Sequence, residues 1–447
     1  MKLIRKVRLR KEHTMFIVFL AIILALTPFL MDLLVRSWNT GLMKSISGAI
    51  KLIYPSGISI IINIVLGFYV GSIILLFRDR YKRIQAIFLS IGITIVSQYL
   101  FRNFDITWDI IPIVIGIAIG IILGARSLKI KNEFRHAANN LSLFSIFYVI
   151  IAFLIIYISS NYSGKFIIDA FTVLGFSYFF GKLMNYESPG LKIFVLGPQN
   201  SGKTMFFAGC YLRALAMTEI PLRPTNDLLD VLHELHSGHV PWPARTGGIS
   251  VYQFTYETGL LFPRKTTMRT IDYPGIFVEN LYDKITVKEN LYDKYIKKDT
   301  KSEEEKRYAR TVAEITNADT LIFIIDAERY PNFGDMGIIH YIKILNKLHE
   351  SGKDIKPYII ITKSDLFMDE FGNKEDYDGF KKFIEEKFTQ NMYLRELLNE
   401  ATNASLFPVF YYVKQVPGER PVPMRDDHGN VYTYGYDHFM DYIMETE

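Results

Sequence analysis

The chain has 447 residues, of which 49% are hydrophobic, and a net charge of +5. Its length allows two or three domains. Residues 1–190 hold 20 Lys and Arg against 8 Asp and Glu, whereas residues 191–447 hold 31 against 38. The acidic second part argues against nucleic acid as a partner, and the basic, apolar first part favours a lipid bilayer with anionic lipids. A single cysteine, Cys210, excludes a disulfide within the chain and suits a reducing compartment.

Residues 1–182 are predicted to form an N-terminal α-helical transmembrane bundle of about six spans. The basic N-terminus precedes an apolar run that is too long for a signal peptide. The expected spans are Met15–Val35, Gly57–Phe77, Ile84–Phe101, Asp109–Ala125, Leu141–Ser159 and Phe166–Gly181. The alternative, buried helices of a large soluble core, would require polar helix faces that these segments lack.

The charges between the spans predict the orientation of the chain. With the N-terminus inside the cell, residues 1–14, 78–83 and 126–137 hold 14 basic residues, and the outer loops hold five. Because basic residues accumulate on cytoplasmic loops, we expect the N-terminus and the part after the last span to be cytoplasmic.

The interior of the spans offers little for transport. Asp169 is the candidate for an ionisable residue deep in a span, where such residues usually mark ion or substrate routes. Gly116, Gly120 and Gly124 form a repeated pattern of small residues that predicts close helix packing, either within the bundle or between copies.

Residues 191–204, LKIFVLGPQNSGKT, combine an apolar run typical of a buried strand with the pattern G-x-x-x-x-G-K-[ST]. Such a loop directs backbone N–H groups at phosphate, and the helix that follows adds its positive end. We expect Lys203 to reach the β- and γ-phosphates and Thr204 to bind Mg²⁺. The residues expected to bind the nucleotide here are Gly197, Asn200, Ser201, Gly202, Lys203 and Thr204.

Residues 218–248 contain four prolines and are predicted to form a mobile loop. The runs Ile249–Tyr256 and Lys265–Ile271 are predicted to form a hairpin that leads into Asp272-Tyr273-Pro274-Gly275. This D-x-x-G element follows a strand, where an open α/β sheet binds its ligands. Asp272 would hold Mg²⁺ through a water and the Gly275 N–H would contact the γ-phosphate; in isolation, the same residues would indicate only a turn.

Pro357–Thr362 is predicted to be a buried strand that ends in Thr362-Lys363-Ser364-Asp365, which fits [NT]-K-x-D. A carboxylate accepts hydrogen bonds and cannot donate them, so Asp365 matches the N1–H and N2 amine of guanine and opposes adenine. The stem of Lys363 can lie over the base. The three residues predicted to bind the base side are therefore Thr362, Lys363 and Asp365.

The order GPQNSGKT, DYPG, TKSD resembles the translation-factor-related (TRAFAC) class of P-loop GTPases over about residues 190–447. The resemblance implies an α/β domain with a six-stranded, mostly parallel sheet and a GTP- and Mg²⁺-dependent switch cycle. It also implies a threonine that senses Mg²⁺, for which we choose Thr246 over Thr225. Lys203, Thr246 and Gly275 are then the expected catalytic residues, and Thr204, Thr246 and Asp272 the expected metal ligands.

Four features depart from a minimal GTPase. A charged insertion covers about residues 276–306, and the usual Ser-Ala motif is absent after Leu406–Val413, where Tyr412, Val413 and Lys414 are the candidates. A Pro-rich loop and a predicted amphipathic helix end the chain, in a layout similar to membrane-associated GTPases of prokaryotic conflict systems. Gly275 is followed by Ile276, which cannot orient a water, so we expect slow hydrolysis.

Taken together, the sequence predicts a membrane-anchored GTPase with a cytoplasmic domain over residues 183–447, which recruits or controls a protein partner or a second copy. Its ligands would be GTP or GDP, Mg²⁺ and the bilayer, with no nucleic acid. The alternatives are a GTP-gated membrane transporter and a membrane-anchored P-loop ATPase.

Overall fold

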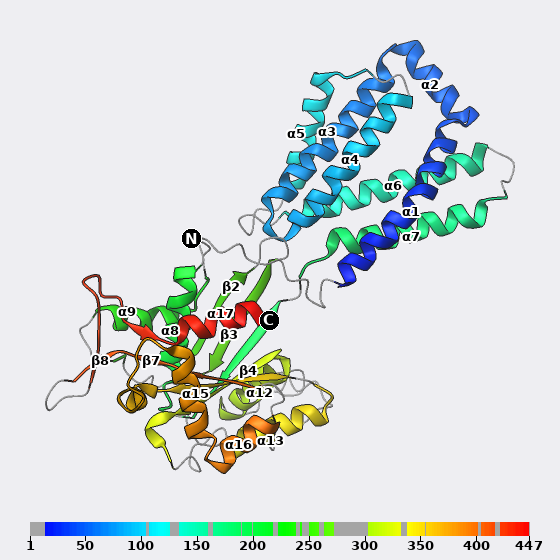
Figure 1. The fold of residues 1–447 in the computed structure, drawn as a ribbon. Coiled ribbons are helices and arrows are strands. Elements are labelled where there is room, and N and C mark those ends of the chain that lie inside the picture. Colours follow the sequence, from blue (N-terminus) through cyan, green and yellow to red (C-terminus); the bar gives the residue numbers. More distant parts are fainter. Residues whose placement is uncertain are drawn as a thin grey trace. The chain divides into compact units, whose positions relative to one another are not determined.

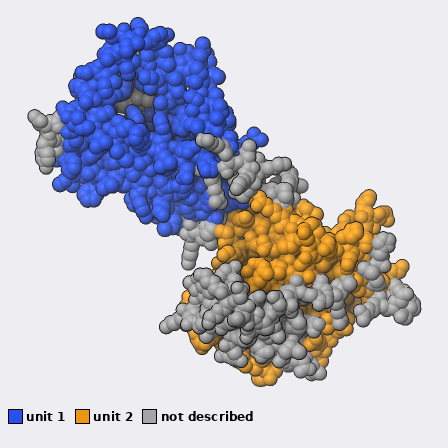
Figure 2. Space-filling view, turned by 180° about the vertical axis from the view of Figure 1, so that it is seen from behind, with its two compact units in different colours: residues 1–189, 259–263 blue, residues 190–258, 264–447 orange. Residues whose placement is uncertain are grey.

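The structure is a computed structural model, and the chain in it divides into two compact units (Figures 1 and 2). Unit 1 comprises residues 1–189 and 259–263, and unit 2 comprises residues 190–258 and 264–447. The structure describes residues 14–103, 107–125, 134–159, 164–188, 190–198, 200–217, 222–237, 242–243, 250–258, 263–271, 303–331, 338–353, 355–400, 404–415 and 421–446.

Unit 1 is helical. Its helices are α1 (Thr14–Trp38), α2 (Gly41–Ile53), α3 (Gly57–Arg78), α4 (Arg83–Asn103), α5 (Ile110–Gly124), α6 (Arg135–Ser159) and α7 (Phe166–Asn185). Within the described residues, four helices, α1, α3, α6 and α7, are long and apolar enough to cross a membrane, and α5 is apolar but shorter. The predicted α-helical region of apolar segments is confirmed, whereas the count of six spans stays a prediction. Helix α2, which lies between the first two expected spans, was not predicted.

Helices α3 and α5 touch through their backbones. A Cβ atom added at Gly67 would lie 2.1 Å from the Ile113 carbonyl oxygen, and one at Gly116 would lie 2.1 Å from the Ile64 carbonyl oxygen. Glycine is required at both places because a side chain would separate the helices. The predicted close packing at Gly116 is therefore confirmed, and it occurs within one chain.

Asp169, the ionisable residue expected deep in a span, lies instead in the first turn of α7 and forms an ion pair. Its carboxylate accepts hydrogen bonds from Arg36 Nη1 at 3.0 Å and Nη2 at 2.6 Å, and from the Tyr157 hydroxyl at 2.7 Å. These residues come from α7, α1 and α6, so the cluster ties three helices together. A buried carboxylate requires such partners, because an unpaired charge is costly away from water.

The other end of α7 is held by side chains from the region where α4 begins. Lys82 is fully buried, and its Nζ donates to the carbonyl oxygens of Met184 at 3.2 Å and Tyr186 at 3.0 Å. Gln85 Nε2 donates to the Tyr186 carbonyl oxygen at 2.9 Å. These bonds satisfy carbonyl groups that a helix leaves free at its C-terminus.

Unit 2 contains a six-stranded sheet in the order β2-β3-β1-β4-β5-β6. The strands are β1 (Leu191–Leu196), β2 (Val251–Thr258), β3 (Arg264–Ile271), β4 (Thr320–Asp326), β5 (Lys356–Thr362) and β6 (Ser405–Pro408). All neighbours are parallel except β2 and β3, which form the predicted hairpin. The mostly parallel α/β sheet is thus confirmed.

The last core strand is shorter than predicted, because β6 ends at Pro408 and not near Val413. The next residues pair outside the main sheet: β7 (Phe410–Tyr411) with β10 (Thr433–Tyr434), and β8 (Val413–Lys414) with β9 (Val422–Pro423). A continuous apolar run concealed this change, because periodicity alone does not show which partner a strand takes.

Helices cover both faces of the sheet (Figure 1). Phe194 and Leu196 of β1 pack with α12 (Glu303–Asn317), α13 (Ile338–Glu350), α15 (Tyr377–Phe388) and α16 (Met392–Glu400). Ile193 and Val195 face the core formed with α8 (Lys203–Met217), α9 (Asn226–Ser237) and α17 (Tyr436–Thr446). This alternation follows from the two-residue period of a strand. A short helix, α14 (Met368–Phe371), completes the unit.

Helix α9 corrects one expectation. It lies within residues 218–248, which the four prolines had suggested to be a mobile loop. The helix forms because its apolar residues recur at helical spacing and are buried against the sheet. Those residues are Leu228, Val231, Leu232 and Leu235.

Candidate nucleotide-binding site

The predicted phosphate and base elements lie at one edge of the sheet. The loop at residues 197–202 follows β1, Asp326 ends β4, and residues 363–365 follow β5. Because these three strands are parallel, their carboxyl ends share an edge. The sheet order places β1 between β3 and β4, which is the switch point where open α/β sheets bind ligands.

Two described residues of the loop after β1 have a left-handed backbone, as residues of anion-binding loops often do. Asn200 has φ 64° and Gly202 has φ 78°, so both lie in the left-handed region on either side of Ser201. Such alternation turns N–H groups toward one concave side. A Cβ at Gly197 would lie 2.8 Å from Ser201 Oγ, which explains the glycine there. Gln199 lies outside the described residues.

Lys203 begins α8, as predicted, and its side chain reaches the end of β3. The residue is only 4% exposed, and its Nζ donates to the carbonyl oxygen of Ile271 at 3.0 Å. Ile271 is the last residue of β3 and directly precedes Asp272. Thr204 follows in the first turn of α8 and is partly buried. The ammonium and the helix N-terminus therefore lie at the same loop, an arrangement suited to an anion.

Thr362 joins the two predicted motifs directly. It is buried, and its hydroxyl is hydrogen-bonded to the carbonyl oxygens of Ser201 at 2.6 Å and Ile325 at 3.2 Å. The TKSD sequence thus lies against the phosphate loop, although 161 residues separate Thr362 from Ser201.

Lys363 contacts two acidic residues that the sequence analysis missed. It has φ 55°, and its Nζ donates to Asp326 Oδ2 at 2.7 Å and Glu328 Oε2 at 2.6 Å. Burial lowers the pKa of Lys363, but the hydrogen bonds to the two carboxylates prevail and raise it. The hydrogen bond from Lys363 lowers the pKa of Glu328. The sequence signal that could have indicated Asp326 is its position as an acidic residue at the carboxyl end of a strand, here β4, which pairs with β1.

Asp365 is partly buried in the turn after Lys363. Burial raises the pKa of its carboxyl group, and the charge of Lys363 opposes this increase. The neighbouring Ser364 is fully buried and donates from Oγ to the Val409 carbonyl oxygen at 3.3 Å, which ties the turn to the end of β6.

The residues proposed to replace the missing Ser-Ala motif take part in other contacts. Tyr412 packs its ring 5.2 Å from that of Phe410 and 6.2 Å from that of Tyr434. Val413 and Lys414 form β8. Nothing in the structure tests whether Tyr412, Val413 or Lys414 contacts a base, so that contact stays a prediction.

Three predicted residues, Thr246, Asp272 and Gly275, lie outside the described residues, as does most of the insertion at 276–306. Thr225, the alternative to Thr246, accepts a hydrogen bond at Oγ1 from the backbone N–H of Gln253 in β2 at 3.2 Å. Across the described ranges, no cluster of three or more His, Cys, Asp and Glu side chains could hold a metal ion. Because Thr246 and Asp272 are not among the described residues, Thr204 is the one expected Mg²⁺ ligand that the structure places.

Comparison with protein-family models found no match, and no curated protein matches the sequence.

Proposed function

We propose that this protein is a membrane-anchored GTPase that binds GTP with Mg²⁺ and acts as a switch. The contact between Thr362 and the Ser201 carbonyl carries the proposal, because it brings together two motifs that serve one ligand in a guanine nucleotide site. A phosphate loop alone would fit any nucleoside triphosphate. A TKSD turn alone would be a common turn at the end of a strand.

Guanine is favoured by the position of Asp365. Its carboxylate follows Lys363, whose stem can cover one face of a base while Asp326 and Glu328 hold its ammonium group. An ionised aspartate offers two acceptors to the N1–H and N2 amine of guanine. Adenine presents an acceptor at N1, which the carboxylate would repel.

Hydrolysis is proposed to be slow. Lys203 would stabilise charge on the phosphates, while Thr204, Thr246 and Asp272 would hold Mg²⁺, which would supply further positive charge against the charge that develops there. The residue after Gly275 is Ile276, which cannot orient the attacking water. A partner protein or a second copy would then supply the missing group, which can change the rate by about 10³–10⁵-fold.

The membrane part is proposed to cross the bilayer about six times, with the N-terminus and unit 2 on the cytoplasmic side. The connection is short in sequence, because α7 ends at Asn185 and β1 begins at Leu191. We therefore propose that unit 1 anchors the switch at the membrane. A GTP-gated transporter is less favoured, because Asp169 is paired with Arg36 and Tyr157. A membrane-anchored P-loop ATPase is opposed by Asp365.

Nucleotide competition on the full-length chain in lipid nanodiscs tests the proposal. A fluorescent GTP analogue should be displaced by GTP and GDP with Mg²⁺, and much less by ATP. Lys203→Ala should abolish binding, whereas Lys192→Ala, which changes an exposed lysine on β1, should not. Equal affinity for GTP and ATP would refute a guanine switch and support the ATPase.

Cysteine labelling tests the orientation. Cys210 is fully buried and burial raises the pKa of its thiol, so the native chain gives a low background. In intact cells a cysteine at Lys44 should react with an impermeant reagent, and one at Arg80 should react only after permeabilisation. Labelling at Arg80 in intact cells would contradict the proposed topology.

A further inference from the structure

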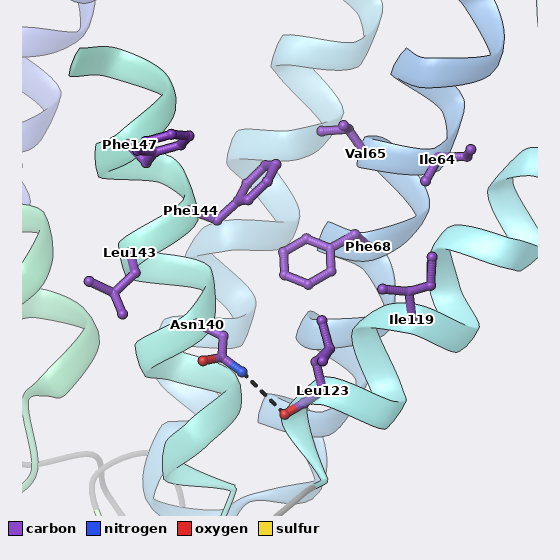
Figure 3. A pocket seen from close by; sticks show the side chains of 9 residues that line it. All are labelled: Ile64, Val65, Phe68, Ile119, Leu123, Asn140, Leu143, Phe144 and Phe147. Atoms are coloured by element: carbon purple, nitrogen blue, oxygen red, sulfur yellow. Dashed lines mark hydrogen bonds between the residues drawn. The ribbon is translucent and has the colours of Figure 1, made fainter. Parts of the chain in front are cut away.

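A groove of about 580 Å³ lies among α3, α5 and α6 of unit 1 (Figure 3). No charged residue lines its described wall, which consists of Ile64, Val65, Phe68, Ile119, Leu123, Asn140, Leu143, Phe144 and Phe147. The polar member, Asn140, donates from Nδ2 to the Leu123 carbonyl oxygen at 3.1 Å and so joins α6 to the end of α5. The groove therefore offers an apolar surface with few hydrogen-bonding groups.

We propose that this groove binds the acyl chain of a membrane phospholipid. The inference rests on the proposed membrane embedding of unit 1 and is independent of nucleotide binding. An acyl chain is uncharged, narrow and flexible, which matches a groove walled by aliphatic and aromatic side chains. The volume lies within the range of about 300–1,000 Å³ that is usual for small-molecule sites.

The groove has a firm wall. Its α3 and α5 sides are held by the glycine contacts at Gly67 and Gly116, which leave no room for the helices to approach further. Its α6 side is joined to α3 by the hydrogen bond between the hydroxyl groups of Tyr69 and Ser145 at 2.7 Å. A chain in this concavity touches three helices, whereas lipid on a flat helix face touches one, so the bound chain should exchange more slowly.

A second copy of the chain fits the groove less well. Membrane helices associate through small residues, and among the described wall residues there is no glycine, alanine, serine or threonine. Gly67 of α3 and Gly116 of α5 already face each other. The nine described residues that line the groove are far fewer than the roughly 20–30 residues on each side of a stable protein interface.

Photo-crosslinking in nanodiscs tests the proposal. The full-length chain is embedded with a phospholipid that carries a diazirine in one acyl chain, and the labelled residues are mapped by mass spectrometry. Labelling should concentrate on groove residues of α3 and α6 relative to Phe171 and Leu174 of α7, which are 72% and 67% exposed. Leu143→Trp should fill the groove and remove this excess. Leu174→Trp should leave the excess labelling unchanged, although Leu174 is about as exposed (67%) as Leu143 (64%).

The other outcomes are distinct. Labelling in proportion to exposure on α3, α6 and α7 would show bulk lipid only and overturn the proposal. Absence of label even at Phe171 would overturn the membrane embedding on which it rests. Cross-links between two chains through the groove would assign it to a second copy. Should Leu143→Trp fail to fold, the ratio of groove to α7 labelling in the unsubstituted chain decides by itself.

Discussion

Each unit buries an aspartate and pairs it with a cation from another element. The side chains of Asp169 in unit 1 and Asp326 in unit 2 are both 4% exposed. Arg36 donates to Asp169 from two nitrogens and to Asp32 from Nε at 3.0 Å, and the Tyr157 hydroxyl adds a third bond to Asp169. The ammonium group of Lys363 donates one hydrogen bond to Asp326 and another to Glu328, and the Lys363 side chain is 38% exposed.

The difference shows two uses of the same interaction. A guanidinium forms a rigid, planar fork, so Arg36 locks α1 to α7. An ammonium is a point charge on a flexible stem, so Lys363 can move while it keeps a partner. The first arrangement suits a permanent joint between helices, and the second suits a residue that must adjust to a ligand.

The largest effect is expected from removing Arg36. Arg36→Met leaves the buried Asp169 without its cation, and the free energy of unfolding in detergent should fall by about 3–5 kcal/mol. The double variant Arg36→Met/Asp169→Leu should recover most of this loss, since an apolar pair of similar volume is often neutral. Lys363→Met should cost less, because its surroundings are more open. Equal losses at the two sites would erase the contrast.

Asp365→Asn tests whether the turn that contains Lys363 belongs to a ligand site. The substitution replaces one carboxylate oxygen, which would accept a hydrogen bond from guanine, by an NH₂ group, which donates. GTP affinity should fall about 10- to 100-fold, because a hydrogen bond to a charged group contributes about 1.5–3 kcal/mol. Xanthosine triphosphate should bind better, because it carries an oxygen where guanine has the amine. Asp369→Asn, on the exposed side of α14, is the matched control. Unchanged nucleotide preference would remove Asp365 from the site.

Glycine substitutions compare packing in the two units. Gly67→Ala forces a Cβ against backbone and should destabilise unit 1 by about 1–3 kcal/mol. In unit 2, a Cβ at Gly209 would lie 2.3 Å from the buried ring of Tyr436. Displacing one side chain should cost less than separating two helix backbones. Gly92→Ala in α4 meets nothing within 4 Å and should be neutral or stabilise by about 0.5–1 kcal/mol. A larger loss at Gly209 than at Gly67 would contradict this ranking.

The smallest effect concerns the pH dependence of the pair formed by Lys363 and Glu328. The pKa of Glu328 is lowered from 4.5, so its contribution to stability is present above pH 4.5 and is lost as the pH falls through the lowered value. The pKa of Lys363 is raised from 10.5, so its contribution is present below pH 10.5 and is lost as the pH rises through the raised value.

Glu328→Gln should therefore lower the stability of unit 2 by about 0–1 kcal/mol between these limits, as for other exposed pairs, and have no effect at lower pH. Urea unfolding at several pH values measures this difference. Glu375→Gln, at an exposed position, serves as control. An effect that grows below pH 4.5 would contradict the assigned direction.

The sequence predicted elements whose cause is local. Long apolar runs indicated the helices of unit 1 except α2, and the run at Ile193 followed by glycine and Lys203 indicated a strand, a loop and a helix, because periodicity and turn residues act within one element. Local signals also misled: four prolines suggested a loop where α9 forms, and one apolar run concealed the end of β6 at Pro408.

The tertiary structure decided which distant residues meet. Gly116 carried a packing signal, but nothing near it indicated Gly67 as its partner. Asp169 stood out as an ionisable residue, yet Arg36 lies 133 positions away, and Asp326 became part of the candidate site only because β4 and β5 are neighbours. Sequence periodicity shows which face of an element is buried, whereas partners depend on how the elements pack in three dimensions.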